Sequence, residues 1–133
     1  MLVRPRALLL SDLNGFISSL GALYVSLYIN NLTPVPSNGI GDFVFETASV
    51  EGAQLLSGLT SAALDVDTAF VQWNDVLWHY GPGPSVSIYG YAVHDSTRST
   101  LHWSERNPTA PFVFGPGTTY TVKPYYSRRN QTT

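Results

Sequence analysis

The chain begins with a hydrophobic pattern of helical period. Within residues 7–20, apolar side chains recur every three or four positions, at Leu9, Leu13, Phe16, Ile17 and Leu20. This spacing predicts a short helix near the N-terminus in spite of Gly15. No other segment indicates a helix.

The pattern changes to a period of two in residues 22–29. Apolar side chains stand at every second position, at Leu23, Val25, Leu27 and Ile29, and Tyr24, Ser26 and Tyr28 fall between them. Because successive side chains of a strand point to opposite faces, this alternation predicts a strand with one buried face. Prolines and glycines in residues 30–41 end it.

Short apolar runs with turn residues in most of the gaps fill the rest of the chain. They cover residues 43–50, 53–59, 69–73, 76–80, 86–94, 99–105, 111–115 and 118–126. About eight short strands at such spacing predict an all-β fold, an antiparallel β-sandwich or jelly roll, with a short N-terminal helix or arm. Strands and helices do not alternate along the chain, so a parallel nucleotide-binding sheet is not expected. The expected organisation is an N-terminal arm and helix at 1–21, a β-sandwich domain at 22–126 and a basic tail at 127–133.

Length and composition indicate one domain of ordinary size that carries few charged residues. The 133 residues are 44% hydrophobic, and only 12% are charged against a typical value of about 25%. The length suits one domain with a real core, and the low charge suggests that a partner covers part of the surface. Cysteine is absent, so disulfides and thiolate metal sites are excluded.

The charges that do occur are unevenly placed. Four arginines stand near the two ends, and the remaining three basic residues against nine acids give 3 − 9 = −6 between them. We expect the ends to be arms that contact an acidic neighbour or a second copy of the chain, although two solvated tails are the alternative. The candidate interface residues are Arg4, Arg6, Leu8, Leu9, Arg128 and Arg129.

Nucleic acid and membrane are not expected as partners. A nucleic-acid-binding domain needs a concentrated basic face, which basic ends on an acidic body do not provide. No apolar run approaches the length of a membrane span. Asp12 and Asn14 interrupt the apolar start too early for a secretory signal.

Residues 87–107 contain a concentration of ionisable side chains, namely two histidines, an aspartate, a glutamate and two arginines. A hairpin that pairs His94 with Thr100 would place both histidines on one face, whereas a slip by one residue would separate them. Two imidazoles without an evident third ligand do not make a catalytic zinc site. Glu105 and Arg106 could form an acid and electrophile pair, but no serine lies in a G-x-S-x-G elbow and no glycine loop has P-loop spacing. The favoured interpretation is that residues 95–99 form a turn, with no catalytic residue, metal or cofactor.

Exposed aromatic side chains are a second candidate feature. Flat rings on a β-sandwich can stack on sugars, contact proteins or simply fill the core. All three interpretations remain open for the candidate aromatic surface, which consists of Trp73, Trp78, Tyr125 and Tyr126.

Three segments carry a resemblance. They are "YVSLYINNLTP" at 24–34, "YGYAVHDSTRSTLHWSER" at 89–106 and "GPGTTYTVKP" at 115–124. In order and spacing they resemble a family of small virion structural proteins of tailed bacteriophages. The diagnostic residues are those of the central hairpin, namely Tyr89, Gly90, Tyr91, Asp95, Trp103, Glu105 and Arg106.

The resemblance implies a structural protein of the virion and no enzyme. The expected role is capsid decoration on the exterior of the shell, with the major capsid protein and further copies of this chain as partners. A tail, baseplate or tail-fibre-like component is the alternative, and a carbohydrate-binding β-sandwich module that takes a host-surface glycan is another. Residues 60–85 match nothing in the family pattern.

Overall fold

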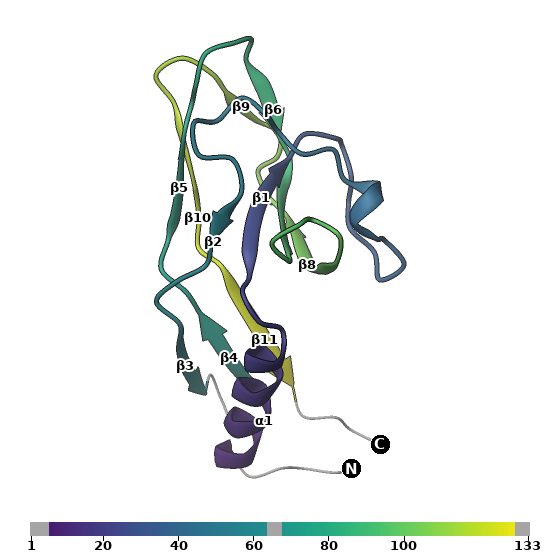
Figure 1. Cartoon of the computed structure of the whole chain (residues 1–133), viewed down its shortest axis with the longest axis vertical. Helices are drawn as coiled ribbons and strands as arrows, with labels where there is room; N and C mark the ends of the chain where they lie inside the picture. The colour runs from purple at the N-terminus through teal and green to yellow at the C-terminus, as the bar shows by residue number, and fades with distance from the viewer. Residues whose placement is uncertain (1–5, 64–67, 130–133) are drawn as a thin grey trace. The chain divides into compact units, whose positions relative to one another are not determined.

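The computed structural model describes residues 6–63 and 68–129. These residues form eleven strands, one α-helix and one short 3-10 helix, η1 (Ile40–Asp42) (Figure 1). All strand pairs are antiparallel, which confirms the prediction of a mainly β, antiparallel fold. The chain divides into two compact units, each built from segments that are far apart in the sequence.

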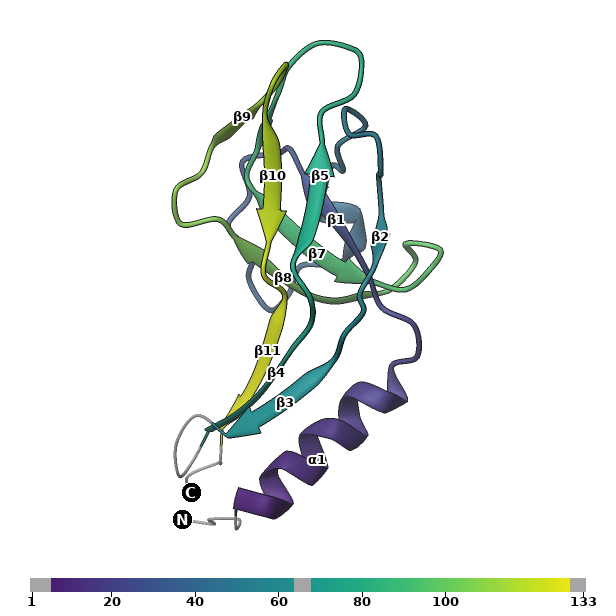
Figure 2. The ribbon, with the colours of Figure 1, turned by 90° about the vertical axis from the view of Figure 1, so that its left-hand side faces the viewer.

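The first unit contains the helix. The predicted helix at 7–20 is confirmed as α1 (Arg6–Ser19). Leu13 and Ile17, four residues apart and hence on one side of the helix, are 0% and 4% exposed. This apolar side contacts a three-stranded sheet of order β11-β4-β3, formed by β3 (Thr60–Ala63), β4 (Thr68–Gln72) and β11 (Tyr125–Arg129) (Figure 2).

Replacement of Gly15 by alanine is expected to stabilise the first unit. Gly15 lies inside α1, is exposed, and has open space where a Cβ would stand. Alanine restricts the unfolded chain and favours the helix, so Gly15→Ala should raise the free energy of unfolding by about 0.5–1 kcal/mol. Equilibrium urea unfolding followed by circular dichroism measures this change. A lower unfolding free energy than wild type would contradict it.

The second unit contains the larger sheet. It has the order β2-β1-β7-β8 and consists of β1 (Tyr24–Tyr28), β2 (Gln54–Leu55), β7 (Gly90–His94) and β8 (Leu101–Arg106). Two further pairs complete the unit, β5 (Val76–His79) with β10 (Thr119–Val122) and β6 (Val86–Ile88) with β9 (Phe112–Phe114). In Figure 2, β5 lies between β10 and β2.

The prediction that β1 has only one buried face is wrong. Ser26 and Tyr28, expected on the opposite face, are 2% and 0% exposed. The hydrogen bond to the imidazole of His94 offsets the cost of burying the Ser26 hydroxyl, and the ring of Tyr28 packs edge-on against Phe43 at 5.0 Å. The central strand is therefore covered on both faces.

Strand boundaries differ from the sequence pattern in several places. The run at 43–50 forms no strand and contributes only isolated bridges, at Phe45 and Ser49. The run at 86–94 divides at Tyr89, where the chain changes partner from β9 to β1. The run at 118–126 divides before Pro124, which has no N–H for the ladder. Strand β3 was not anticipated.

The expected boundary between a β domain and a basic tail also differs. Strand β11 continues past residue 126 and pairs Arg128 with Ala69 and Arg129 with Thr68. Neither described unit coincides with the expected 22–126 domain, since the first unit includes β3, β4 and β11. No helix among the described residues is long and apolar enough to span a membrane.

Candidate functional site

The hairpin of β7 and β8 matches the expected one-residue slip only at His94, and the rest of its register is given by neither expectation. Val93 faces Trp103 and Gly90 faces Arg106, two positions away from the pairing that His94 with Thr100 would impose. An irregularity between Val93 and His94 then places His94 opposite Leu101. The expected pairing is wrong for two reasons: the pairing at His94 is already one position away from it, and an extra residue of β8, His102, adds the second position from Val93 onward. Val93 and Trp103 still share a face, as expected.

His94 is held as a neutral structural group. Its Nδ1 lies 2.6 Å from the carbonyl oxygen of Asp95, and its Nε2 lies 2.8 Å from the Ser26 hydroxyl. A carbonyl only accepts, so Nδ1 carries the proton and Nε2 accepts from Ser26. Burial lowers the pKa of His94 by disfavouring the charged form. Both partners are buried, so this serine and histidine have no access to a substrate.

Asp95 organises the turn of the hairpin. Its carboxylate accepts hydrogen bonds from the backbone N–H groups of Ser99 and Thr100 and from the hydroxyls of Thr97 and Ser99. These bonds, led by that of the Ser99 hydroxyl, hold the pKa of Asp95 well below its usual value. Arg98 takes a left-handed backbone conformation with φ of 55° to close the loop. The interpretation of residues 95–99 as turn chemistry is confirmed.

Arg106 connects the hairpin to the loop that follows β1. Its guanidinium donates to the side-chain oxygen of Asn31 at 2.8 Å and to the carbonyl of Leu32 at 3.3 Å. The same group lies 5.3 Å from the centre of the Tyr89 ring, within the range of a cation–π contact. The guanidinium group of Arg106 therefore holds the hairpin and this loop together.

Gly90 allows two neighbours to approach closely. A Cβ at this position would overlap the carbonyl oxygen of Glu105 and lie 2.7 Å from the Tyr28 hydroxyl. The Tyr28 hydroxyl donates to Leu32, and burial raises its pKa to about 12. The other hairpin residues that resemble the family are buried or half-buried, at Tyr91, Trp103 and Glu105.

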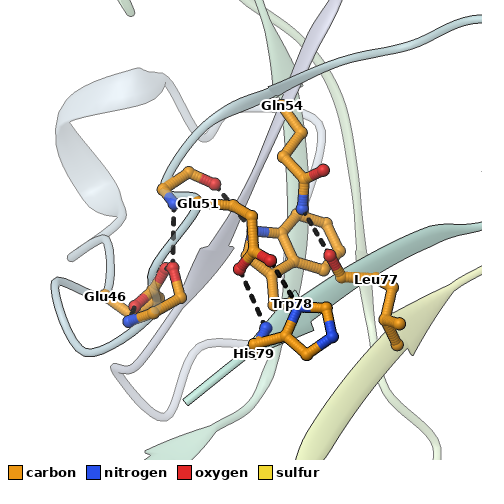
Figure 3. A network of polar contacts seen from close by, with 8 residues as sticks. Glu46, Glu51, Gln54, Leu77, Trp78 and His79 are labelled. Atoms are coloured by element: carbon orange, nitrogen blue, oxygen red, sulfur yellow. Dashed lines mark hydrogen bonds and ion pairs between the residues drawn. The ribbon is translucent and has the colours of Figure 1, made fainter. Parts of the chain in front are cut away.

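A second polar network, which sequence reasoning missed, joins the 46–54 segment to β5 (Figure 3). The Glu51 carboxylate accepts from the backbone N–H of His79 at 2.8 Å and bonds its Nδ1 at 2.5 Å. The indole of Trp78 donates to the carbonyl of Gly52 at 2.6 Å, and the Gln54 amide donates to Leu77. No local motif marks these contacts, because the partners lie more than twenty residues apart.

A buried carboxylate shapes the same segment. Glu46 is 4% exposed and accepts from both the backbone N–H and the hydroxyl of Ser49. The Ser49 hydroxyl in turn accepts from the N–H of Gly52 at 2.9 Å. Glu46 thus organises an irregular segment where the apolar pattern predicted a strand.

The Glu51–His79 contact is expected to make stability depend on pH. Burial alone would raise the pKa of Glu51, but the hydrogen bonds from His79 outweigh it and lower the pKa below 4.5. A folded-state pKa below the unfolded one contributes stability above the unfolded pKa, and the contribution is lost as pH falls through the folded pKa. At pH 7, Glu51→Gln should therefore lower the unfolding free energy by up to about 1 kcal/mol.

The measurement is urea unfolding of wild type and Glu51→Gln at pH 7 and at pH values descending below 4.5. We expect the difference between the two proteins to shrink across the acid range. Gln54→Ala, which removes a neighbouring neutral hydrogen bond, is the matched control. Its difference in unfolding free energy from wild type should not change as Glu51 becomes protonated. A constant Glu51→Gln difference across this range would contradict the prediction.

Of the three interpretations left open for the candidate aromatic surface, burial in the core holds for two of its four residues. Trp73 is 8% exposed and Trp78 is 0% exposed, because both side chains fill the core of their units. Tyr126 packs against Phe16 of α1, with ring centres 5.5 Å apart. Tyr125 alone of the four is substantially exposed, at 45%.

Tyr125 lines a cavity of about 460 Å³ in the first unit. Phe70, Trp73 and Pro124 supply the rest of its apolar wall. Three polar side chains complete it, those of Gln72, Asp75 and Lys123. The sequence shows both strands that form this wall but not that they pair.

The proposed arms stay a prediction. Arg4 lies outside the described residues. Arg6, Leu8 and Leu9 lie on α1, and Arg128 and Arg129 lie on β11, but their side chains are outside the described part of the structure. Among the described residues, no group of three or more histidine, aspartate or glutamate side chains is placed to hold a metal ion.

Comparisons with known protein families, with curated proteins and with solved structures found no match for this chain. The geometry and the sequence resemblance therefore carry the functional interpretation.

Proposed function

We propose that this chain is a non-enzymatic structural protein of a tailed-bacteriophage virion, a capsid decoration protein that binds the outer surface of the major capsid protein shell. In this proposal the antiparallel sheets form a β-sandwich or jelly roll. Copies of the chain contact the shell and one another, and the arginines near the two ends contact an acidic neighbour.

The observation that carries the proposal is the way the resembling segments meet. Two of them, at 24–34 and 89–106, form one continuous piece of structure, because β1 pairs with β7 and β7 pairs with β8. Arg106 then bonds to Asn31 and Leu32. The residues that resemble the family thus bond to one another and support a role as scaffold.

Exposed apolar side chains support the proposal that a partner protein covers part of the surface. Several large apolar side chains are 40–70% exposed, at Val35, Val44, Val50, Leu55, Leu59, Leu77, Val113 and Tyr125. With only 12% charged residues, the surface carries little of the charge that keeps free proteins apart. Both features suit a protein that is permanently bound in an assembly.

Binding of this kind stabilises a shell by mass action. A protein that binds the assembled shell but not free capsid subunits shifts the equilibrium toward the shell by RT ln(1 + [L]/Kd) per site. The stabilisation needs no chemical step, only occupancy of many equivalent sites. A shell with this protein should therefore resist heat better than the same shell without it.

The test is a cryo-EM reconstruction of purified particles that contain the chain, with mass spectrometry to count its copies relative to the major capsid protein. Copies at every equivalent position of the shell lattice are the expected result. A few copies at a tail or baseplate would overturn the capsid assignment in favour of the tail alternative. Absence from the particles would overturn both.

A further inference from the structure

We propose that the cavity beside Tyr125 is a binding site for a neutral hexopyranose unit of a glycan. The site lies entirely within the first unit, on the sheet of order β11-β4-β3. The inference is independent of any place in a virion, because it rests on this sheet alone.

The two faces of the sheet differ. Val71 of β4 and Tyr126 of β11 are directly opposite each other, and Tyr126 packs on Phe16 of α1. Their neighbours, Gln72 and Tyr125, are also paired and therefore point to the other face. The helix covers one face, and the cavity opens on the face that the helix leaves uncovered.

The cavity wall provides the apolar surface that a sugar ring needs. Trp73 and Pro124 are buried beneath it, and the backbone N–H of Trp73 donates to the carbonyl of Pro124 at 3.1 Å. This bond joins the two chain segments that form the wall. Tyr125, 45% exposed, and Phe70, half-buried, present ring surface on which the C–H groups of a pyranose can pack.

The polar groups at the cavity match the hydroxyls of the same ligand. The side chains of Gln72, Asp75 and Lys123 are exposed, and together they offer an amide, a carboxylate and an ammonium group. A sugar hydroxyl both donates and accepts, so it can bond to each of these groups. The carboxylate and the ammonium cancel in formal charge, which favours a neutral ligand over a charged one.

The size of the cavity favours a small ligand over a protein partner. Ligand cavities hold about 300–1,000 Å³, and the observed volume of about 460 Å³ lies in that range. They combine a mainly apolar wall with a few polar groups, as here. A stable protein contact needs a broad surface of about 800 Å² on each partner instead.

The test is a titration of the isotope-labelled full chain, followed by NMR, with maltotriose, cellotriose and triacetylchitotriose in separate experiments. We expect at least one to shift the Trp73 indole and the Gln72 side-chain amide in a saturable way, in the millimolar range. Each responding trisaccharide is then compared with its own monosaccharide. Tighter binding of the trisaccharide assigns the site to glycan chains, and equal binding assigns it to free sugars of the same class.

Two variants locate the site. Tyr125→Ala removes the exposed ring and Gln72→Ala removes the amide, and each should weaken binding about five- to tenfold. Val113→Ala, at a position 64% exposed on β9, is the matched control and should bind as wild type does. Circular dichroism checks that each variant is folded. If Tyr125→Ala does not fold, Gln72→Ala decides, since its side chain is exposed.

Three results would overturn the proposal. The first is no saturable shift with any of the three trisaccharides. The second is unchanged binding in folded Tyr125→Ala and Gln72→Ala. The third is a response confined to the second unit, which would move sugar binding to another surface.

Discussion

Gly90→Ala is expected to lower the unfolding free energy by about 3 kcal/mol, because the methyl group has no space. It would overlap the carbonyl oxygen of Glu105 and lie 2.7 Å from the Tyr28 hydroxyl. The first of these is backbone of the paired strand β8 and cannot move without breaking the ladder. Tyr28 is fully buried and cannot rotate away. Equilibrium urea unfolding followed by circular dichroism measures the loss.

The matched control is Gly41→Ala in η1. A Cβ at Gly41 meets nothing within 4 Å, so the same chemical change should alter the unfolding free energy by less than about 0.5 kcal/mol. The pair separates steric overlap at Gly90 from a general effect of removing glycine. Equal unfolding free energies for Gly90→Ala and wild type would show that β7 and β8 are not in contact as described.

Trp78→Ala is expected to lower the unfolding free energy by about 3–5 kcal/mol, the cost of emptying a large core position. The side chain is 0% exposed, and its indole N–H donates to Gly52. Trp78→Phe keeps much of the ring but leaves the Gly52 carbonyl without this donor, so it should cost about 1–3 kcal/mol. The two losses together separate packing from hydrogen bonding.

Leu77→Ala is the control for this series, because the neighbouring side chain on β5 is 40% exposed. It should cost less than about 1 kcal/mol. Circular dichroism is the suitable probe, since removal of a tryptophan changes the fluorescence itself. If Leu77→Ala were as damaging as Trp78→Ala, the assignment of the inner and outer faces of β5 would be wrong.

Local pattern was sufficient for much of the fold. The helical spacing of Leu13 and Ile17 predicted α1, and the alternation after residue 22 predicted β1. The points at which one strand ends and the next begins were predicted less well, because they depend on a change of partner strand, as at Tyr89. Ser26 could not be predicted to be buried, because its partner His94 lies 68 residues away.

The candidate site was predictable only in part. Asp95 and the serines that follow it signal a turn through side chains close in sequence, and that prediction is confirmed. Trp73 and Tyr125 belong to the candidate aromatic surface, and the sequence does not distinguish the buried ring from the exposed one. Glu51 and His79 carry no local signal, since only the folded chain brings them together.

The interleaved order of the two units has a consequence for synthesis on the ribosome. The helix and β4 of the first unit are made early, but β11, which pairs with β4, is made only after every strand of the second unit. Until β11 emerges, one edge of β4 lacks its partner strand and Phe16 of α1 lacks its contact with Tyr126. The first unit therefore stays unfinished until the strands of the second unit have been made, and incomplete units of this kind expose apolar surface that aggregates or that chaperones bind.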